Sequence, residues 1–335
     1  MSSHSPTEAA THIAGDWGTT HLRLHLCRGT AVLDKADGPG IGALTASPAT
    51  ILFDAIRPWS SKHGALPIWL AGMVGSRNGW REVPYASCPA DIDELRGALL
   101  KFRAHDHEVA IAAGVSCTNR HGAPDVMRGE ETQILGALAA QPALGRGRHI
   151  VALPGTHTKW ALLEDGRLHS FQTSLSGELY ALLAERSTLL KAGTATGGHA
   201  PKGERRPEGV PREAGSESDE RVGFDAGLRR SRELATVPLT HMLFEVRSRQ
   251  LIQGLSPTAA GAFLSGLIIG QDVLGALPMF DQASPGAAVP IIGAPKLAAL
   301  YSAAMAAHGI NSFPFDATTL TVAGLTALAQ SGSQE

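Results

Sequence analysis

Cysteine and aromatic residues are scarce in this sequence. Its 335 residues include 3 cysteines, Cys27, Cys88 and Cys117, and no two of them have the Cys-x-x-Cys spacing. Three isolated thiols cannot form a disulfide framework or a cysteine-rich zinc site, so we expect reduced, buried side chains. Aromatic residues make up 5% of the chain, whereas glycine occurs 38 times. This balance favours an α/β protein with many tight turns over a coiled coil.

The chain also lacks an excess of charge and a long uninterrupted apolar run. The net charge is −2 and no basic stripe is present, so nucleic acid and anionic membranes are poor partners. The most apolar window, 263–277, is interrupted by Gln271 and Asp272 and is too short to span a bilayer. The first residues do not form a secretory signal. We expect a cytoplasmic protein, and the oligomeric state is not predicted.

Several catalytic signatures are missing. The sequence has no Gly-x-x-x-x-Gly-Lys-Ser/Thr, no His-Glu-x-x-His and no Gly-x-Ser-x-Gly, which argues against P-loop enzymes, zinc proteases and α/β-hydrolases. The glycines at 38–42 do not have the Gly-x-Gly-x-x-Gly spacing and do not begin a helix. A dinucleotide-binding domain is therefore not expected.

Strand and helix patterns alternate along the chain, which is long enough for two domains. The expected strands are 12–19, 21–28, 30–35, 67–71, 149–154 and one that begins at Val289, and the expected helices are 130–140, 296–307 and 317–329. Residues 192–222 contain almost no apolar side chains, so they cannot recover the entropy cost of ordering. We predict a disordered insertion there, without a catalytic role.

A weak internal repeat relates the two halves at an offset of 137 positions. Gly18-Thr19 aligns with Gly155-Thr156, and the turn at 28–29 aligns with the turn at 165–166. Each half thus reads as strand, Gly-Thr turn, strand, glycine turn, strand. Two related domains of this kind would place two Gly-Thr turns on opposite sides of a cleft, where they could bind a polyanion.

The chemistry of the Gly-Thr turns favours phosphate. Glycine permits close approach, and backbone amides and threonine hydroxyls donate hydrogen bonds to phosphate oxygens. Asp16 would repel phosphate unless a divalent cation lay between them, so it is a candidate Mg²⁺ ligand, directly or through water. The alternative is an ordinary hairpin with a surface aspartate. The second turn in register makes the phosphate interpretation the better one.

Two acidic residues begin the helix predicted at 130–140. Glu130 or Glu131 could accept the proton of an attacking hydroxyl during phosphoryl transfer, and Arg128 could hold a substrate carboxylate. Acidic residues at a helix start are equally explained by the helix dipole. The residues alone leave catalysis and capping with equal weight.

Two glycine turns complete the candidate site. The loop at 71–80 follows a buried strand and suits a small polar ligand, although such loops also serve as plain connections. Its candidate substrate-binding residues are Gly72, Met73, Gly75, Ser76 and Trp80. The turn at Gly293-Ala294 follows a second buried strand and would flank the adenosine of a bound nucleotide.

In their order along the chain, these motifs resemble those of the actin, hexokinase and heat-shock chaperone superfamily. Within it, the sequence resembles the 2-dehydro-3-deoxygalactonokinase family. The segments that carry this resemblance are 71–76 with 79–80, 126–133, 154–157 with 159–160, 176–179, 243–247 and 263–270. The family implies transfer of phosphate from ATP to the terminal 6-hydroxyl of 2-dehydro-3-deoxy-D-galactonate, in galactonate breakdown.

The resemblance implies two RNase H-like α/β domains of the actin and hexokinase type around an ATP-binding cleft. We expect an N-terminal domain at 1–128, a C-terminal domain at 129–315 and a last helix within 316–335 that packs back on the first domain. Mg²⁺–ATP would lie between the two turns. The predicted phosphate-binding residues are Asp16, Trp17, Gly18, Thr19, Thr20, Arg23, Gly155, Thr156, His157 and Lys159.

One departure concerns the catalytic base. Kinases of the superfamily usually have an aspartate at this helix start, where this chain has Glu130 and Glu131, and we prefer Glu130. Two other functions stay open, namely a kinase for a different sugar or sugar acid and a nucleotide-dependent switch protein without catalysis.

Overall fold

The computed structural model describes residues 10–191 and 217–330. Its first sheet has six strands in the order β3-β2-β1-β4-β7-β6. Their bounds are β1 His12–Trp17, β2 His21–Arg28, β3 Ala31–Pro39, β4 Ile68–Ala71, β6 Leu100–Ala104 and β7 His107–Ile111. β1, β2 and β3 form an antiparallel meander, and β4 and β7 continue the sheet parallel to β1.

The second sheet repeats this topology. Its strand order is β12-β11-β10-β13-β14, again an antiparallel meander followed by two parallel strands. The bounds are β10 Arg148–Leu153, β11 Thr158–Glu164, β12 Arg167–Ser174, β13 Val289–Ile292 and β14 Ser312–Phe315. A meander joined to parallel strands on its first-strand side is the RNase H-like arrangement. The predicted α/β fold with two such units is confirmed, and the internal repeat is the repeated meander.

A small third sheet, β5-β8-β9, packs against β12 of the second sheet. Its strands are β5 Ala86–Ser87, β8 Val115–Thr118 and β9 Pro124–Met127. Asp125 accepts hydrogen bonds from the backbone N–H and hydroxyl of Thr173 in β12, so the third sheet is attached to the second one. The boundary predicted at residue 128 remains a prediction.

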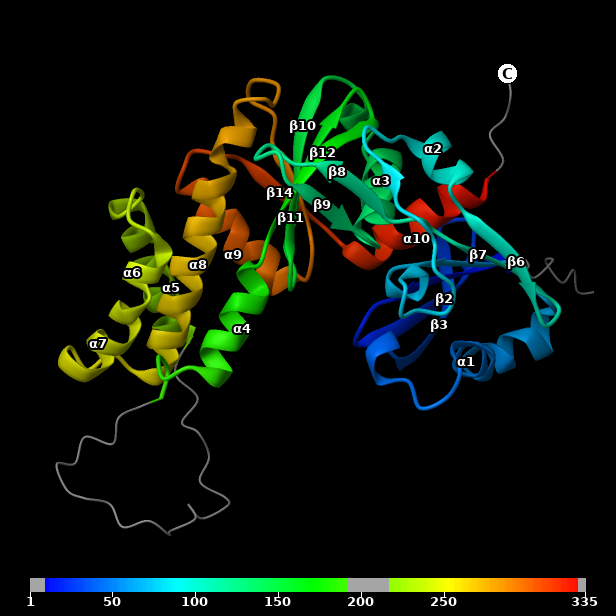
Figure 1. Ribbon diagram of the computed structural model, residues 1–335, viewed down its shortest axis with the longest axis horizontal. Helices are drawn as coiled ribbons and strands as arrows, with labels where there is room; N and C mark the ends of the chain where they lie inside the picture. The colour runs from blue at the N-terminus through cyan, green and yellow to red at the C-terminus, as the bar shows by residue number, and fades with distance from the viewer. Residues whose placement is uncertain (1–9, 192–216, 331–335) are drawn as a thin grey trace, which may run out of the picture.

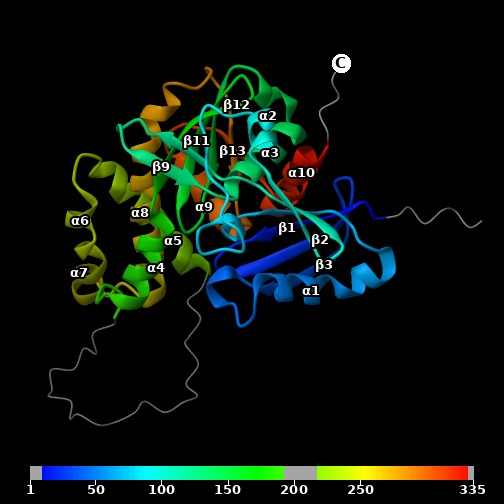
Figure 2. The same ribbon diagram turned by 45° about the vertical axis from the view of Figure 1, so that its right-hand side comes forward.

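The α-helices surround the two large sheets. Their bounds are α1 Pro48–His63, α2 Ile92–Gly97, α3 Glu130–Ala140, α4 Ser176–Arg186, α5 Glu217–Glu233, α6 Leu239–Met242, α7 Phe244–Ile252, α8 Pro257–Phe280, α9 Pro295–Ala306 and α10 Ala317–Ala329. Short 3-10 helices occupy Ile41–Ala43, Met73–Gly75 and Pro142–Gly145. Figures 1 and 2 show α1 against the first sheet and α4 to α8 gathered beyond the second.

The helices α3 and α10 lie between the two large sheets (Figure 1). They cross with backbone contact, because a side chain at Gly136 would collide with the carbonyl oxygen of Leu320, and one at Gly324 with that of Thr132. α10 is also bound to the first sheet, where His12 Nε2 lies 3.1 Å from the Thr326 hydroxyl oxygen. The last helix therefore packs against the N-terminal sheet.

Two expectations were wrong in detail. Residues 192–216 of the predicted insertion lie outside the described residues, but 217–222 form the first turns of α5. The apolar window is longer than predicted, since α8 begins after the Ser256 cap and runs for 24 residues. Among the described helices it alone is long and apolar enough to span a membrane, and 61% of its most apolar window is buried inside the protein. That burial is typical of a core helix.

Candidate active site

The first Gly-Thr turn joins β1 to β2. The N–H of Gly18 donates to the carbonyl of His21, and the amides of Gly40, Ile41 and Gly42 donate to the carbonyls of this turn. The glycines at 38–42 thus support the turn from behind. Thr19 and Thr20 are exposed, as a phosphate site requires. The Trp17 indole is fully buried and donates to the carbonyl of Pro39, so Trp17 could contact phosphate only through its backbone.

Asp16 is the penultimate residue of β1 and forms an ion pair with Arg23, its partner in the β1–β2 register. Their nearest side-chain atoms are 3.6 Å apart, and 28% of the Asp16 side chain is exposed. Burial raises the pKa of Asp16, and the positive charge of Arg23 opposes that rise. A second cation near this carboxylate would further favour its ionised form.

Three segments that are distant in the sequence meet beside Asp16. Gly72 has a φ of +91°, and a Cβ there would lie 3.1 Å from Asp16 Oδ1 and 2.9 Å from the Trp17 carbonyl oxygen. Gly129 has a φ of +110°, and a Cβ there would lie 3.4 Å from the Cα of Gly72. Both positions favour glycine because of their positive φ, and Gly72 also lacks space for a side chain. The first turn, the 71–80 loop and the start of α3 are therefore in direct contact.

The two acidic residues at the start of α3 occupy different environments. Glu130 Oε2 accepts from the N–H of Arg128 at 3.1 Å, and Glu131 Oε2 accepts from the N–H of Gly129 at 2.6 Å, so both bond backbone N–H groups at the entrance to the helix. Glu131 is 1% exposed and its Oε1 is buried without a partner. Glu130 keeps partial exposure. This backbone bond and catalysis are compatible for Glu130, whereas Glu131 does not reach the surface.

Burial raises the pKa of both glutamates. For Glu130, the positive charge of Lys159 is the largest opposing effect, and the negative charge of Asp16 adds to the rise. For Glu131, burial and then the charge of Glu130 raise the pKa to about 8. The pKa of Glu130 is thus affected by the charges of both Asp16, beside the first turn, and Lys159, beyond the second turn.

Arg128 lies against the 71–80 loop. Its Nη2 donates to the carbonyl of Val83 at 2.8 Å, and its guanidinium carbon lies 4.4 Å from the centre of the Tyr85 ring. A Cβ at Gly75 would be 2.9 Å from Arg128 Nη1. The Nε and Nη1 atoms of Arg128 are buried without partners. A buried guanidinium with unpaired donors is costly and suits an anionic ligand.

The second Gly-Thr turn joins β10 to β11. The start of α4 packs directly on it, since a side chain at Gly177 would collide with the Gly155 carbonyl oxygen. The N–H of Glu178 donates to the carbonyl of Thr156, and His157 Nε2 lies 2.6 Å from Glu178 Oε2. Thr156 and His157 are exposed, so both could contact phosphate.

A buried network supports this turn from below. The hydroxyl of Tyr301 lies 2.9 Å from that of Thr158 and 2.8 Å from that of Ser176, and it donates to Asp272. Trp160 Nε1 donates to the same carboxylate. Burial raises the pKa of Asp272. The network connects β11, α4, α8 and α9, and Asp272 in the apolar helix is explained by it.

The predicted adenosine turn lies next to the second Gly-Thr turn. β13 pairs parallel to β10, and a Cβ at Gly293 would lie 3.0 Å from the Pro154 carbonyl oxygen. Ala294 is exposed and occupies the N-cap position of α9. A nucleotide that contacts both the Gly293-Ala294 turn and the second Gly-Thr turn would need the two turns to lie close together in this way.

The 71–80 loop divides into two parts. Met73 and Ser76 belong to the tight turn that begins at Gly72, where the hydroxyl of Ser76 donates to the carbonyl of Met73. Trp80, in contrast, packs edge-on against Phe53 and Phe102. The structure thus gives the Trp80 ring a packing role in the N-terminal core.

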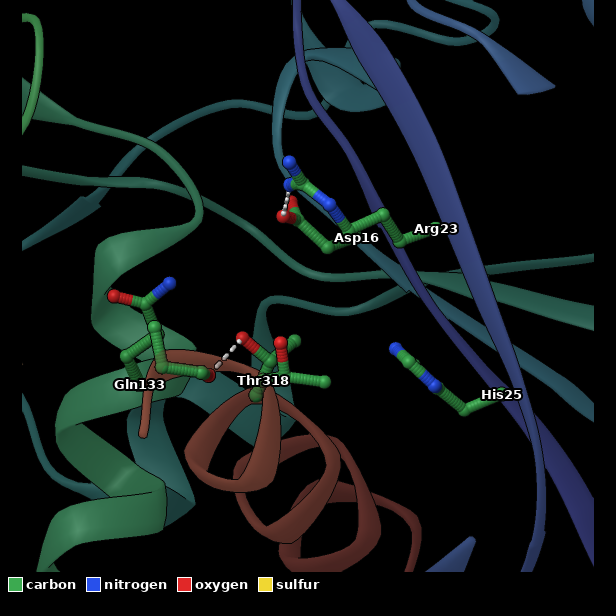
Figure 3. A pocket seen from close by; sticks show the side chains of 7 residues that line it. Asp16, Arg23, His25, Gln133 and Thr318 are labelled. Atoms are coloured by element: carbon green, nitrogen blue, oxygen red, sulfur yellow. Dashed lines mark hydrogen bonds and ion pairs between the residues drawn. The ribbon is translucent and has the colours of Figure 1, made fainter. Parts of the chain in front are cut away.

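A cavity of about 80 Å³ lies beside Asp16, and most of the residues that line it were not among the predicted site residues. Figure 3 shows Gln133 of α3, Thr318 of α10 and His25 of β2 around it, with the Asp16–Arg23 pair above. Gln133 follows Glu130 by three positions, and this helical spacing could have indicated it. No local signal connects Thr318 to residue 16.

Comparisons with known proteins agree with this geometry. The sequence model of the 2-keto-3-deoxy-galactonokinase family matches residues 16–328. The 2-dehydro-3-deoxygalactonokinase of Escherichia coli (strain K12) is 32% identical, over 96% of this chain and 98% of its own. A Rhizobium meliloti (strain 1021) protein for which the same activity is inferred is 34% identical, over 97% and 98%.

A solved structure supports the same assignment. The crystal structure of a candidate 2-dehydro-3-deoxygalactonokinase from Sinorhizobium meliloti superposes with a TM-score of 0.80 at 34% identity, and the match covers 97% of each chain. The likeness therefore extends over both large sheets and the helices between them. The chain belongs to the 2-keto-3-deoxy-galactonokinase family.

Proposed function

We propose that this protein is an ATP-dependent kinase that phosphorylates the 6-hydroxyl of 2-dehydro-3-deoxy-D-galactonate, in galactonate catabolism. One observation carries the site assignment. Glu130 begins the helix that meets the first turn through Gly72 and Gly129. The charges of both Asp16 and Lys159 affect the pKa of Glu130. Family membership over nearly the whole chain supports the substrate. Since ATP is an intracellular metabolite, we place the protein in the cytoplasm.

The residues present fit a magnesium ion. Asp16 offers a partly exposed carboxylate at the first turn, and Mg²⁺ in kinases is commonly held by one or two carboxylates together with substrate phosphates. The described residues contain no group of three His, Cys, Asp or Glu side chains that could hold a metal alone. Asp16 would anchor the ion, which neutralises developing phosphate charge when bound.

Phosphoryl transfer also needs a base and groups that hold the phosphates in place. The 6-hydroxyl oxygen forms the new bond to the γ-phosphorus while the bond to ADP breaks, and the hydroxyl proton passes to Glu130. The turns at 18–20 and 155–157 would hold the phosphates, and Gly293-Ala294 would flank the adenosine. Positioning and charge neutralisation supply most of the rate.

Arg128 is the proposed partner of the substrate carboxylate. Its unpaired Nε and Nη1 atoms face no protein acceptor, and its position against Gly75 places it at the 71–80 loop. We expect Arg128→Gln to raise the KM for the sugar acid by about ten- to a hundredfold, because a charge-assisted hydrogen bond contributes about 1.5–3 kcal/mol. An unchanged KM would remove this role.

The test of the function is ADP release with Mg²⁺–ATP and 2-dehydro-3-deoxy-D-galactonate, run beside the gluconate epimer and neutral hexoses. Glu130→Gln should lower kcat by roughly 10²–10⁴-fold, and Glu131→Gln by much less. Turnover only on a neutral sugar would support kinase activity but refute the sugar acid as the substrate. ATP binding without transfer to any of these alcohols would favour the nucleotide switch.

A further inference from the structure

Lys159 is a buried lysine whose ammonium group contacts protein, not solvent. It follows the second Gly-Thr turn and is 5% exposed. Its Nζ donates to the carbonyl of Val126 at 3.2 Å and to the hydroxyl oxygen of Thr173 at 3.0 Å. Thr173 is itself held by Asp125 through its N–H and hydroxyl. Burying a lysine is costly, so this arrangement calls for an explanation beyond packing.

The contact with Val126 fixes the end of β9, from which the chain runs directly to Glu130. Only three residues separate Val126 from Glu130, and the carboxylate of Glu130 returns to bond the N–H of Arg128. A clamp on Val126 therefore limits the movement of Glu130. Lys159 lies in the second sheet, whereas Asp16 belongs to the first sheet and Gly72 directly follows β4 of that sheet. The clamp therefore also sets the position of Glu130 relative to the two turns.

The charge of Lys159 acts on the same carboxylate. The charged groups around Glu130 are Lys159 from β11, Asp16 from β1, and Glu131 beside it on α3. Burial, and then the negative charge of Asp16, favour a protonated Glu130, and Lys159 is the largest influence that opposes them through charge. A protonated glutamate cannot accept the substrate proton.

We propose that Lys159 is a positioning residue, which aligns Glu130 through the end of β9 and keeps it negatively charged so that it can act as the base. This inference rests on the proposed function. In place of the phosphate contact predicted for Lys159 from the sequence, it assigns Lys159 contacts with Val126 and Thr173 and a charge interaction with Glu130. Within the described residues, the Lys159 ammonium contacts Val126 and Thr173, which are parts of the clamp.

The experiment compares Lys159→Met and Lys159→Arg in the full-length enzyme. We expect Lys159→Met to lower kcat at pH 7 by about tenfold or more, within the roughly 10²–10⁴-fold contribution of a general base. In a plot of kcat against pH, the fall in kcat toward low pH (the acid limb) should move to higher pH in this variant. The reason is that loss of the positive charge raises the pKa of Glu130. The KM for ATP should change less than about twofold, and Lys159→Arg should keep the wild-type limb.

Two further variants complete the design. Lys101→Met, at an exposed lysine of β6, removes a positive charge elsewhere and should leave the profile unchanged. Thr173→Val keeps the charge of Lys159 but removes one acceptor, so it tests the clamp if Lys159→Met does not fold. We expect Thr173→Val to lower kcat with little movement of the acid limb.

The outcomes separate this inference from the proposed function. A higher KM for ATP in Lys159→Met with an unmoved limb would make Lys159 a phosphate ligand and overturn the inference. Wild-type kinetics in Lys159→Met, or in Thr173→Val where Lys159→Met does not fold, would overturn it too. If Glu130→Gln is inactive while the limb of Lys159→Met stays in place, only this inference fails. Full activity of Glu130→Gln would refute the proposed base as well.

Discussion

Glu131 gives the clearest prediction about stability. Its side chain is 1% exposed, one carboxylate oxygen accepts from Gly129 and the other is buried without a partner. Burial and the neighbouring charge of Glu130 raise the pKa of Glu131 from the ordinary value of 4.5 to about 8. The folded protein therefore keeps Glu131 protonated at neutral pH, whereas the unfolded chain ionises it.

The sign and size of the effect follow from this difference. Between about pH 4.5 and pH 8 the folded state binds one more proton than the unfolded state at this residue, so wild-type stability falls as pH rises. Each pH unit is worth about 1.4 kcal/mol, which gives up to about 5 kcal/mol over the interval. Glu131→Gln carries no proton to lose, so this loss is absent from the variant.

The assay is urea unfolding of wild type and Glu131→Gln at several pH values between 5 and 9. The variant should gain free energy of unfolding relative to wild type as pH rises, and the gain should level off above about pH 8. Glu185→Gln, at an exposed glutamate of α4, is the matched control and should show no such trend. A difference between wild type and Glu131→Gln that does not change with pH would refute a protonated Glu131.

Three other predictions concern the helix crossing, the metal and the buried network. Gly324→Ala forces a methyl group onto the Thr132 carbonyl and should lower the free energy of unfolding by about 1–3 kcal/mol. The control Gly275→Ala, with open space around it, should raise the free energy of unfolding by about 0.5–1 kcal/mol. Equal effects of the two substitutions would refute the tight crossing. Asp16→Asn should weaken Mg²⁺ activation by about 10–100-fold, and an unchanged Mg²⁺ titration would exclude Asp16 as the anchor. Tyr301→Phe should lower the melting temperature through a loss of about 1–3 kcal/mol, and an unchanged melting temperature would refute the network.

Much of the fold could be predicted because it has local signals. The offset of 137 positions predicted the repeated meander, since glycine turns and alternating apolar residues recur in both halves. The bounds of α3 and α10 were predicted correctly, because Asp316 caps α10 and acidic residues begin α3. Residues 217–222 were assigned to the insertion because they are polar, but tertiary packing of α5 makes them helical.

The candidate site was predictable only in its parts. The motifs identified Asp16, Glu130 and the two Gly-Thr turns as separate candidates, because residue chemistry and turn geometry are encoded locally. The sequence left capping and catalysis by Glu130 as equal alternatives. It also could not separate Trp80, which packs into the N-terminal core, from the glycines beside it, which contact the site.

By itself, the sequence determined the α/β class, the duplicated architecture, the family and the candidate phosphate-binding residues. Only the tertiary structure decided that Gly72 and Gly129 bring Asp16 next to the start of α3, that Glu131 is sealed from solvent, and that Lys159 turns toward Val126. The physical reason is that periodicity, capping and turn chemistry act over a few residues. Burial and long-range contact, which set the pKa and direction of each side chain, exist only once distant segments have packed together.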